Sequence, residues 1–479
     1  MGKYDLIVIG AGSGGLVAAV GANYIGAKVL LIEKEKLGGD CLNYGCVPSK
    51  AIIKSAAVSH YARNAKNYGI KLDNLQTDFP EVIKRVQSIV QGIATTHDSK
   101  ERFESLGIKV LMGNASFMSD HEIQVHSEMN NETVSYYGKK IVIASGGRPN
   151  VPPIEGLAES APLTNLNIFS LEKQPEHLVV LGGGPIGAEL SQAFRRLGSR
   201  VTMIIKGQLL PREDKDAAKL LHKQFEKEGV ELIEFVDSID SVKKEGMQKS
   251  VSYTKDGKSY SLKGDQVLAS LGRIPNVEGL NLESCGVEYG RRGIMVNNRM
   301  QTNVRHIYAC GDICGPYQFT HLASYQAGII IKNAFTPLKT KADYKAFPWC
   351  TYTDPEVAHV GMSDSELKSG NIEHKKYKFD LHHVDRAKSE GETAGFIKIA
   401  VKKNGEILGV TIVAPHAGEL LPEYTLALRK GLKVSDIYDT VHSYPTMSEL
   451  NKFVIGEYMK EKFTPSMKKF LKWWNGFSD

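Results

Sequence analysis

Short apolar runs alternate with helical stretches along most of the chain, a pattern typical of α/β proteins. Residues 4–9 form an apolar run that predicts a buried strand, and residues 16–25 have the small and apolar composition of a helix. A second apolar run, 28–32, predicts the next strand and is followed by Glu33. The hydrophobic pattern therefore predicts a β-α-β unit at the start of the chain.

A glycine-rich loop joins the first strand of this unit to its helix. It matches the GxGxxG fingerprint with Gly10, Gly12 and Gly15, and Ser13 and Gly14 complete it. The first glycine allows a tight turn, the second lets the backbone approach a pyrophosphate, and the third allows close packing of helix and strand. The helix N-terminus supplies an anion site. The loop therefore predicts a dinucleotide site, with a plain glycine-rich turn as the weaker alternative.

The same arrangement returns later in the chain. A strand predicted at 177–181 leads into a second GxGxxG loop and a helix that ends near Leu197, and a further strand follows at 200–205. The candidate binding residues of this loop are Gly182, Gly184, Ile186 and Gly187. Two fingerprints in one chain imply two dinucleotides bound at once.

The two repeats differ in the residue after the second strand. Glu33 can accept hydrogen bonds from a ribose, whereas Lys206 stands at the equivalent place of the second repeat. Lys206 and Arg212 could receive a 2′-phosphate, although Gly187 gives the tight packing common in NAD sites. We expect NADPH over NADH, and a merely solvated Lys206 remains the alternative.

Two cysteines, Cys41 and Cys46, stand five residues apart before Pro48 and a helix predicted from residue 51 onward. Cys46 is expected in the first turn of that helix, where free amide groups and the helix dipole favour a thiolate. The four intervening residues allow the two sulfurs to pair, which predicts a dithiol that cycles with a disulfide. Half of a zinc site and a static disulfide are the alternatives.

Composition and charge restrict the class of protein and its cellular location. The 479 residues are expected to form about three domains, and the net charge of +6 is too mild and dispersed to indicate nucleic-acid binding. The chain has no run of eighteen apolar residues, and its first strand leaves no room for a signal peptide. We therefore expect a cytoplasmic protein. Six cysteines do not form a disulfide framework here, and no set of resident metal ligands is predicted.

These motifs together resemble the class I pyridine nucleotide-disulfide oxidoreductases, a family that includes dihydrolipoamide dehydrogenase, glutathione reductase and mercuric reductase. The resemblance covers nearly the whole chain. The matching stretches are Gly10–Gly15, Gly39–Lys50, Ala144–Pro149, Gly182–Glu189, Leu271–Asn276 and Ile307–Asp312.

The resemblance implies an α/β fold with two Rossmann-like domains and a C-terminal α+β interface domain of a homodimer. FAD would bind residues 1–150 and a return segment, 273–345, and NAD(P)H would bind residues 151–272. A proline-rich connector after residue 150 fits the first boundary. Antiparallel strands and helices predicted from residue 346 to 479 fit the interface domain.

The resemblance also implies an electron path. Hydride would pass from nicotinamide to flavin, the flavin would reduce the Cys41–Cys46 disulfide, and the dithiol would reduce a substrate. Cys46 would lie against the flavin and Cys41 would exchange with the substrate. Lys50 and Glu189 match an ion pair near the flavin, where a cation stabilises the reduced ring. Further cofactor-binding residues implied are Gly39, Ala115, Ser145, Gly146, Gly272, Asp312, Thr320 and His321, with Asp312 on the ribityl chain.

The chain departs from the family near its C-terminus. Disulfide-reducing members place an acid/base His immediately before the Pro that corresponds to Pro445, but this chain has Tyr444 there, with Glu449 retained. A phenol ordinarily has a pKa near 10 and is a poor proton shuttle at neutral pH. Mercuric reductases carry a Tyr in what resembles this place, yet they also carry a C-terminal Cys pair, which this chain lacks. His442 as a substitute and a degenerate site are the other possibilities.

Three smaller features complete the picture. Asp40 replaces the family's usual Thr beside the first cysteine, without an evident role. Cys310 is expected to be buried after a strand, with an accessory metal site together with Cys314 as the weak alternative. The basic, aromatic stretch 459–474 could lie on a membrane surface, but packing on its own domain is favoured.

Two functional hypotheses follow. The first is an FAD-dependent NAD(P)H oxidoreductase whose acceptor is a disulfide, a metal ion or a small electrophile such as a quinone. Within it, mercuric reductase-like chemistry leads and dihydrolipoamide dehydrogenase is the alternative. The second is a slow flavin-holding redox sensor that uses the dithiol as a switch.

Overall fold

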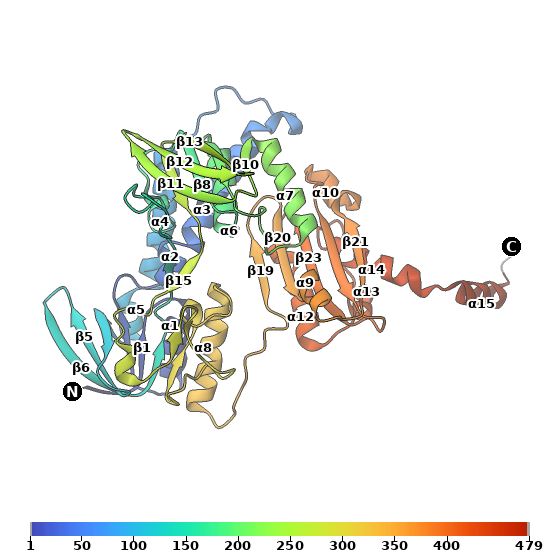
Figure 1. Cartoon of the computed structure of the whole chain (residues 1–479). Coiled ribbons are helices and arrows are strands. Elements are labelled where there is room, and N and C mark those ends of the chain that lie inside the picture. Colours follow the sequence, from blue (N-terminus) through green and yellow to red (C-terminus); the bar gives the residue numbers. More distant parts are fainter. Residues whose placement is uncertain (1, 477–479) are drawn as a thin grey trace. The chain divides into compact units, whose positions relative to one another are not determined.

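The computed structural model describes residues 2–476, which form a mixed α/β chain (Figure 1). The chain divides into two compact units. The first runs as far as Lys206 and resumes from Phe235 to Ala342, and the second comprises Gly207–Glu234 and the chain from Asp343 onward. The fold class predicted from the sequence is confirmed. The predicted division into four segments stays a prediction.

The first unit contains a seven-stranded sheet in the order β3-β2-β1-β6-β5-β4, with β18 also paired to β6. The strands are β1 (Gly2–Ile9), β2 (Val29–Glu33), β3 (Lys109–Met112), β4 (Asn114–Phe117), β5 (Glu122–Ser127), β6 (Glu132–Ile143) and β18 (Ile307–Ala309). Strands β3, β2, β1, β6 and β18 are parallel, whereas β5 runs antiparallel to both of its neighbours, β4 and β6.

The continuous apolar run of β1 reflects burial on both faces of this sheet. Leu6 and Val8 belong to one hydrophobic cluster, and Ile7 and Ile9 belong to another. Successive side chains of a strand point to opposite faces, so each face contributes to a separate core. Helices α1 (Ser13–Tyr24) and α8 (Thr320–Phe335) pack together on the first of these faces.

A second parallel sheet in the same unit carries the repeated loop. Strand β8 (His177–Leu181) lies between β9 (Arg200–Ile204) and β14 (Gln266–Ala269). Helix α6 (Pro185–Leu197) follows the loop and packs against α3 (Cys46–Arg63). The remaining larger elements of this unit are α4 (Phe79–Thr96), α5 (Lys100–Ser105), and the antiparallel strands β11 (Ser238–Glu245), β12 (Gln248–Lys255) and β13 (Lys258–Gly264).

The second unit is built on a five-stranded antiparallel sheet in the order β19-β20-β23-β22-β21. These strands are β19 (Pro348–Thr351), β20 (Glu356–Gly361), β21 (Lys375–Asp380), β22 (Phe396–Val401) and β23 (Ile407–Ala414). Its larger helices are α7 (Lys215–Glu228), α12 (Pro422–Lys430), α14 (Glu449–Lys462) and α15 (Pro465–Asn475).

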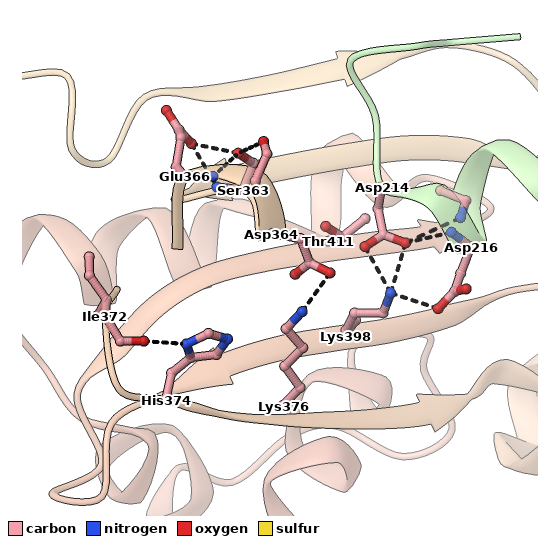
Figure 2. A network of polar contacts seen from close by, with 12 residues as sticks. Asp214, Asp216, Ser363, Asp364, Glu366, Ile372, His374, Lys376, Lys398 and Thr411 are labelled. Atoms are coloured by element: carbon pink, nitrogen blue, oxygen red, sulfur yellow. Dashed lines mark hydrogen bonds and ion pairs between the residues drawn. The ribbon is translucent and has the colours of Figure 1, made fainter. Parts of the chain in front are cut away.

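An ion-pair network joins α7 to this sheet (Figure 2). Lys398 on β22 donates to both carboxylate oxygens of Asp214 at 2.8 Å and lies 2.6 Å from Asp216. Asp214 also accepts from backbone amides at the start of α7, so one carboxylate caps the helix and anchors it to the strand. This network is one of the links between residues 207–234 and the C-terminal part of the chain, with which they form the second unit.

The structure corrects two local predictions. The stretch 106–117 predicts one strand from its sequence, but the structure has two strands, β3 and β4, separated at Gly113, where an added Cβ would lie 2.6 Å from the His126 carbonyl oxygen. The favoured packing of the stretch 459–474 on its own domain holds for Met459, which is partly buried against the C-terminal core, but is wrong for Pro465–Asn475, none of which is buried.

Candidate active site

Three helices begin at the predicted sulfur pair. Cys46 is the first residue of α3, Ser13 the first of α1 and Thr320 the first of α8. Cys41 lies on the short helix α2 (Gly39–Asn43) that precedes α3. Helix N-termini carry partial positive charge and free amide groups, so their convergence favours an anion at this place.

The two thiols interact directly and have opposite acidities. The thiol of Cys41 donates a hydrogen bond to Cys46, which is the largest cause of the lowering of the Cys46 pKa to about 6. The Thr320 hydroxyl, 3.2 Å from the Cys46 sulfur, and the charge of Lys50 act in the same direction, against burial. The hydrogen bond with Cys46 raises the pKa of Cys41, and burial adds to the increase. The pair therefore shares one proton at neutral pH.

The redox segment is held against the first glycine-rich loop. The Gly38 amide donates to the Ala11 carbonyl oxygen at 2.9 Å. Gly39 has φ of 57°, and a Cβ on it would lie 2.7 Å from the Cα of Gly12. A side chain is excluded at this position both by the left-handed backbone and by the close approach of the two loops. The sulfur pair therefore lies beside the loop that follows β1.

Arg273 connects the redox segment to the return segment of the same unit. Its guanidinium lies 3.3 Å from Asp40 and 3.0 Å from Asp312, and it donates to the Gly147 carbonyl oxygen at 2.8 Å. Asn165 donates to the other Asp40 oxygen at 2.9 Å. Asp40 is thus a structural acceptor beside Cys41, a role that the sequence did not reveal. Arg273 lies within the motif 271–276, which was the only signal that could have identified it.

Asp312 therefore forms an ion pair with Arg273 of the same chain and is also a candidate ligand of a ribityl chain. Burial raises the pKa of Asp312, and the charge of Arg273 opposes that rise.

Lys50 and Glu189 form the predicted ion pair, with 2.8 Å between Nζ and Oε2. The Glu189 side chain is buried on α6, so the pair links the start of α3 to the second glycine-rich unit. The functional roles of Asp312 and of the Lys50–Glu189 pair stay proposals.

Both glycine-rich loops have the shape that a dinucleotide requires. Among the described residues, no side chain caps α1 at Gly12 or α6 at Gly184, which leaves their first amides available to a pyrophosphate. A Cβ on Gly15 would collide with the Gly10 carbonyl oxygen, and one on Gly187 would lie 2.5 Å from a backbone oxygen. Gly184 faces open space. The close contacts of Gly15 and Gly187 match the packing role expected of the third fingerprint glycine, and the open space at Gly184 matches the role of the second, which faces the pyrophosphate.

The acidic residue of the first repeat has protein partners. One oxygen of Glu33 accepts from the Ala11 amide at 2.7 Å and the other accepts from the Glu35 amide at 2.9 Å. Burial raises the pKa of the Glu33 carboxyl. Each carboxylate oxygen retains a further acceptor position for a ribose hydroxyl. In the second repeat, Lys206 is exposed just after β9, whereas Arg212 belongs to the other compact unit.

The remaining cofactor candidates occupy loops and strand ends of the first unit. Ser145 exchanges hydrogen bonds with Asn276, its hydroxyl donating at 2.9 Å and its carbonyl oxygen accepting at 2.9 Å. Gly146 and Gly272 have positive φ and open surroundings. Ala115 is half-buried on β4, and Ile186 and His321 are exposed near the starts of α6 and α8.

The C-terminal candidates lie in the second unit. Tyr444 is 71% exposed, and its hydroxyl donates to Asp385 at 3.3 Å. His442 instead turns inward and pairs with Glu423 at 2.9 Å, which makes it part of its own unit's interior. Glu449 begins α14 and accepts from the Thr446 amide at 3.4 Å. The exposed phenol is therefore the group that this segment presents.

A separate group of Asp120, His121 and His306 places possible ligand atoms within 4.8 Å of one another. The two imidazole rings stack with centroids 3.8 Å apart and planes 7° apart. Imidazole lone pairs lie in the ring plane, so parallel stacked rings cannot both direct one at a single ion. His306 contacts the Asp120 carbonyl oxygen at 2.8 Å, and the group ties the β4–β5 turn to the residue before β18.

The family follows from this arrangement and from comparison with known proteins. The profile described as pyridine nucleotide-disulphide oxidoreductase matches residues 4–327, and the dimerisation domain of that family matches residues 347–453. The chain belongs to the pyridine nucleotide-disulphide oxidoreductase family. It is therefore a flavin-dependent enzyme of a family that uses FAD and NAD(P)H, as predicted.

Relatives of this oxidoreductase include proteins with two different names. It is 34% identical over 451 residues to a mercuric reductase of Staphylococcus aureus, covering 94% of this chain and 81% of that protein. It is 35% identical over 452 residues to a dihydrolipoyl dehydrogenase of Chlamydia trachomatis, covering 93% of this chain and 95% of that protein.

Solved structures agree with the family. The Cu(II) complex of the HOCl-induced flavoprotein disulfide reductase RclA from Escherichia coli has a TM-score of 0.84 at 26% identity, covering 95% of this chain and 99% of that chain. LpdA from Mycobacterium tuberculosis has a TM-score of 0.87 at 26% identity, covering 96% and 100%. The dimerisation domain supports the predicted homodimer. Within residues 2–476, no helix has the length and apolarity needed to cross a membrane.

Proposed function

We propose that this oxidoreductase passes reducing equivalents from NAD(P)H through the Cys41–Cys46 pair to a soft metal ion or another small electrophile, as in mercuric reductase-like chemistry. The observation that carries the proposal is the place of the Cys46 sulfur at the start of α3, 3.2 Å from the Thr320 hydroxyl and in contact with Cys41, where the pKa of Cys46 is lowered to about 6. Bound FAD would supply a two-electron carrier between the nicotinamide and the sulfurs.

The protein's own groups hold the pair in a reactive form. The Thr320 hydroxyl and Lys50 stabilise the Cys46 thiolate, and Cys41 keeps the proton. Oxidation of the dithiol to the disulfide releases two electrons and two protons, so a disulfide acceptor also needs a group that moves protons. A soft metal ion instead displaces protons from thiols when it binds them. Tyr444 in place of the family's His therefore favours a metal ion over lipoamide.

The alternative acceptor is lipoamide, the disulfide partner of dihydrolipoamide, and the relatives named dihydrolipoyl dehydrogenase favour it. The electron donor, NADPH or NADH, is also to be decided. The exposed Lys206 just after β9 supports NADPH, because a cation there can pair with a 2′-phosphate. Lys206→Glu is expected to raise the KM for NADPH and to leave the KM for NADH nearly unchanged.

An acceptor panel tests the proposal on the purified holoenzyme. Turnover is measured with lipoamide, glutathione disulfide, Hg(II), Cu(II) and quinones, each with NADH and with NADPH. We expect a metal ion to be the best acceptor, and Cys41→Ser and Cys46→Ser to abolish that turnover. Cys350→Ser is the matched control, since Cys350 is a half-buried thiol of the second unit. Full activity of Cys46→Ser on every acceptor would contradict the electron path.

Tyr444→His separates the two acceptors. If the missing proton shuttle limits disulfide reduction, this variant gains lipoamide turnover by about a hundredfold or more, the usual contribution of a general acid or base. Its turnover with metal ions stays close to that of the wild type. Wild-type turnover with lipoamide that exceeds turnover with every metal ion would instead identify a dihydrolipoyl dehydrogenase.

A further inference from the structure

The last helix, α15, is specified by its own sequence and yet buries none of its side chains. Thr464 caps its N-terminus by accepting from the Met467 amide at 3.3 Å, Pro465 is its first residue, and Gly476 ends it with φ of 65°. These are strong local start and stop signals. Nevertheless none of Pro465–Asn475 is buried. An 11-residue helix without packing is only marginally stable in water, so a surface that covers it would stabilise it.

The apolar side chains of α15 lie on one side. Met467, Phe470, Leu471 and Trp474 follow the spacing i, i+3, i+4 and i+7 that places residues on a single helical face. Phe470 is 54% exposed and Trp474 is 70% exposed. Trp473 flanks this face, with its ring centroid 5.9 Å from that of Phe470 and 6.5 Å from that of Trp474. The helix therefore presents a continuous aromatic surface.

The opposite side of the helix is cationic. Lys468, Lys469 and Lys472 occupy it, and the segment from Lys462 to Gly476 contains no acidic residue. All three lysines are exposed. A second copy of the helix laid against the first would bring like charges together, which disfavours self-association. A negatively charged surface with an apolar layer beneath it complements both sides of α15 at once.

We propose that α15 docks this enzyme in the plane of an anionic lipid bilayer surface. Trp473 and Trp474 would lie at headgroup depth with Phe470 below them, as amphipathic aromatic rings do at membrane interfaces. The lysines would contact the anionic headgroups. With about 1.5 Å of rise per residue, 11 residues span about 16 Å, roughly half of the hydrocarbon core, so the helix lies along the surface.

Vesicle flotation with the full-length holoenzyme tests this proposal. The vesicles contain phosphatidylcholine with about 30 mol% phosphatidylglycerol, or phosphatidylcholine alone. We expect binding to the anionic vesicles that weakens at least about tenfold between about 0.1 and 1 M NaCl, because salt screens the lysines. Trp473 and Trp474 are two of the three tryptophans of the chain, so tryptophan emission should shift to shorter wavelength on binding.

Two variants separate the charged and the apolar contributions. K468Q/K469Q/K472Q is expected to lower the vesicle partition coefficient by about a hundredfold, at about fivefold per lysine. W473S/W474S is expected to lower partitioning to both vesicle types and to abolish the emission shift. The matched control is K219Q/K223Q/K227Q, which removes the same charge from exposed lysines on α7 and should change partitioning less than about threefold.

Three results would overturn the proposal. The wild type could partition no better to anionic than to neutral vesicles, or the α15 lysine variant could behave like the α7 control. A change in oligomeric state caused by W473S/W474S in light scattering, with vesicle partitioning unchanged, would identify a second copy of the chain as the occupant. Turnover of each variant without vesicles should equal that of the wild type, which shows that the enzyme remains folded.

Discussion

Thr320→Val is the most direct test of the chemistry assigned to the sulfur pair. The variant keeps the size of the side chain and removes the hydroxyl that lies 3.2 Å from the Cys46 sulfur. When Cys46 is ionised, this hydroxyl is the donor. A hydrogen bond to a charged group contributes about 1.5–3 kcal/mol, and 1.36 kcal/mol corresponds to one pKa unit. The Cys46 pKa should therefore rise from about 6 to about 7–8.

The assay is the rate of alkylation of reduced enzyme by iodoacetamide as a function of pH, with the modified cysteine assigned by peptide fragmentation. Because the thiolate is the reacting species, the rate at Cys46 follows its ionised fraction. At about pH 6, that fraction falls from about a half to between a tenth and a hundredth, so alkylation slows about five- to fiftyfold. Cys310 and Cys314 are internal references that stay unmodified, since burial raises the pKa of both.

Thr320→Ser is the matched control, because it keeps the hydroxyl and should keep the wild-type profile. An unchanged midpoint in Thr320→Val would refute the assignment of this hydrogen bond to the thiolate. A shift of equal size in both variants would attribute the change to the lost methyl group and would also refute it.

Three further changes test other parts of the structure. Burial raises the pKa of Glu213 to about 7, so the folded state binds this proton more tightly than the unfolded state and loses stability as pH rises from about 4.5 to 7. Above about pH 7, Glu213→Gln should therefore increase the free energy of unfolding by about 3 kcal/mol relative to the wild type. The measurement is the thermal midpoint at alkaline pH, which should be higher in the variant; equal midpoints there would contradict the prediction. Gly187→Ala should destabilise the fold by about 3 kcal/mol in chemical unfolding, because its Cβ would collide with backbone. Gly184→Ala should leave unfolding unchanged and raise the KM for the nicotinamide. A Gly187→Ala variant as stable as the wild type would contradict the close packing assigned to Gly187. Lys398→Met leaves the buried carboxylate of Asp214 unpaired and should cost about 3–5 kcal/mol in urea unfolding, and a loss below about 1 kcal/mol would show that the pair matters little.

Local sequence patterns were sufficient for the fold class and for the position of the sulfur pair. Both glycine-rich loops could be placed because each needs glycine at fixed spacing between a strand and a helix. The start of α3 at Cys46 was predictable for a similar reason, since Pro48 and the helical stretch after it mark a helix N-terminus. These signals involve residues within one or two turns of each other.

The partners of the sulfur pair were decided by tertiary structure. Thr320 is 274 residues away from Cys46 in the sequence and reaches it only because α1 and α8 pack on one face of the sheet. Arg273 joins Asp40, near the start of the chain, to Asp312, which gave Asp40 a role that its sequence neighbours did not suggest.

The second unit shows the same division between local and distant information. The antiparallel strands of the C-terminal part were predictable from their alternation, but the attachment of residues 207–234 to them involves distant contacts such as that between Lys398 and Asp214. Its lysines and aromatic residues likewise singled out the stretch 459–474 in the sequence, whereas only the structure showed that a separate helix, α15, begins at Pro465 and leaves its apolar side exposed. Helix and strand periodicity is a property of neighbouring residues, while a contact between distant segments depends on which surfaces pack together, and spacing along the chain does not encode that choice.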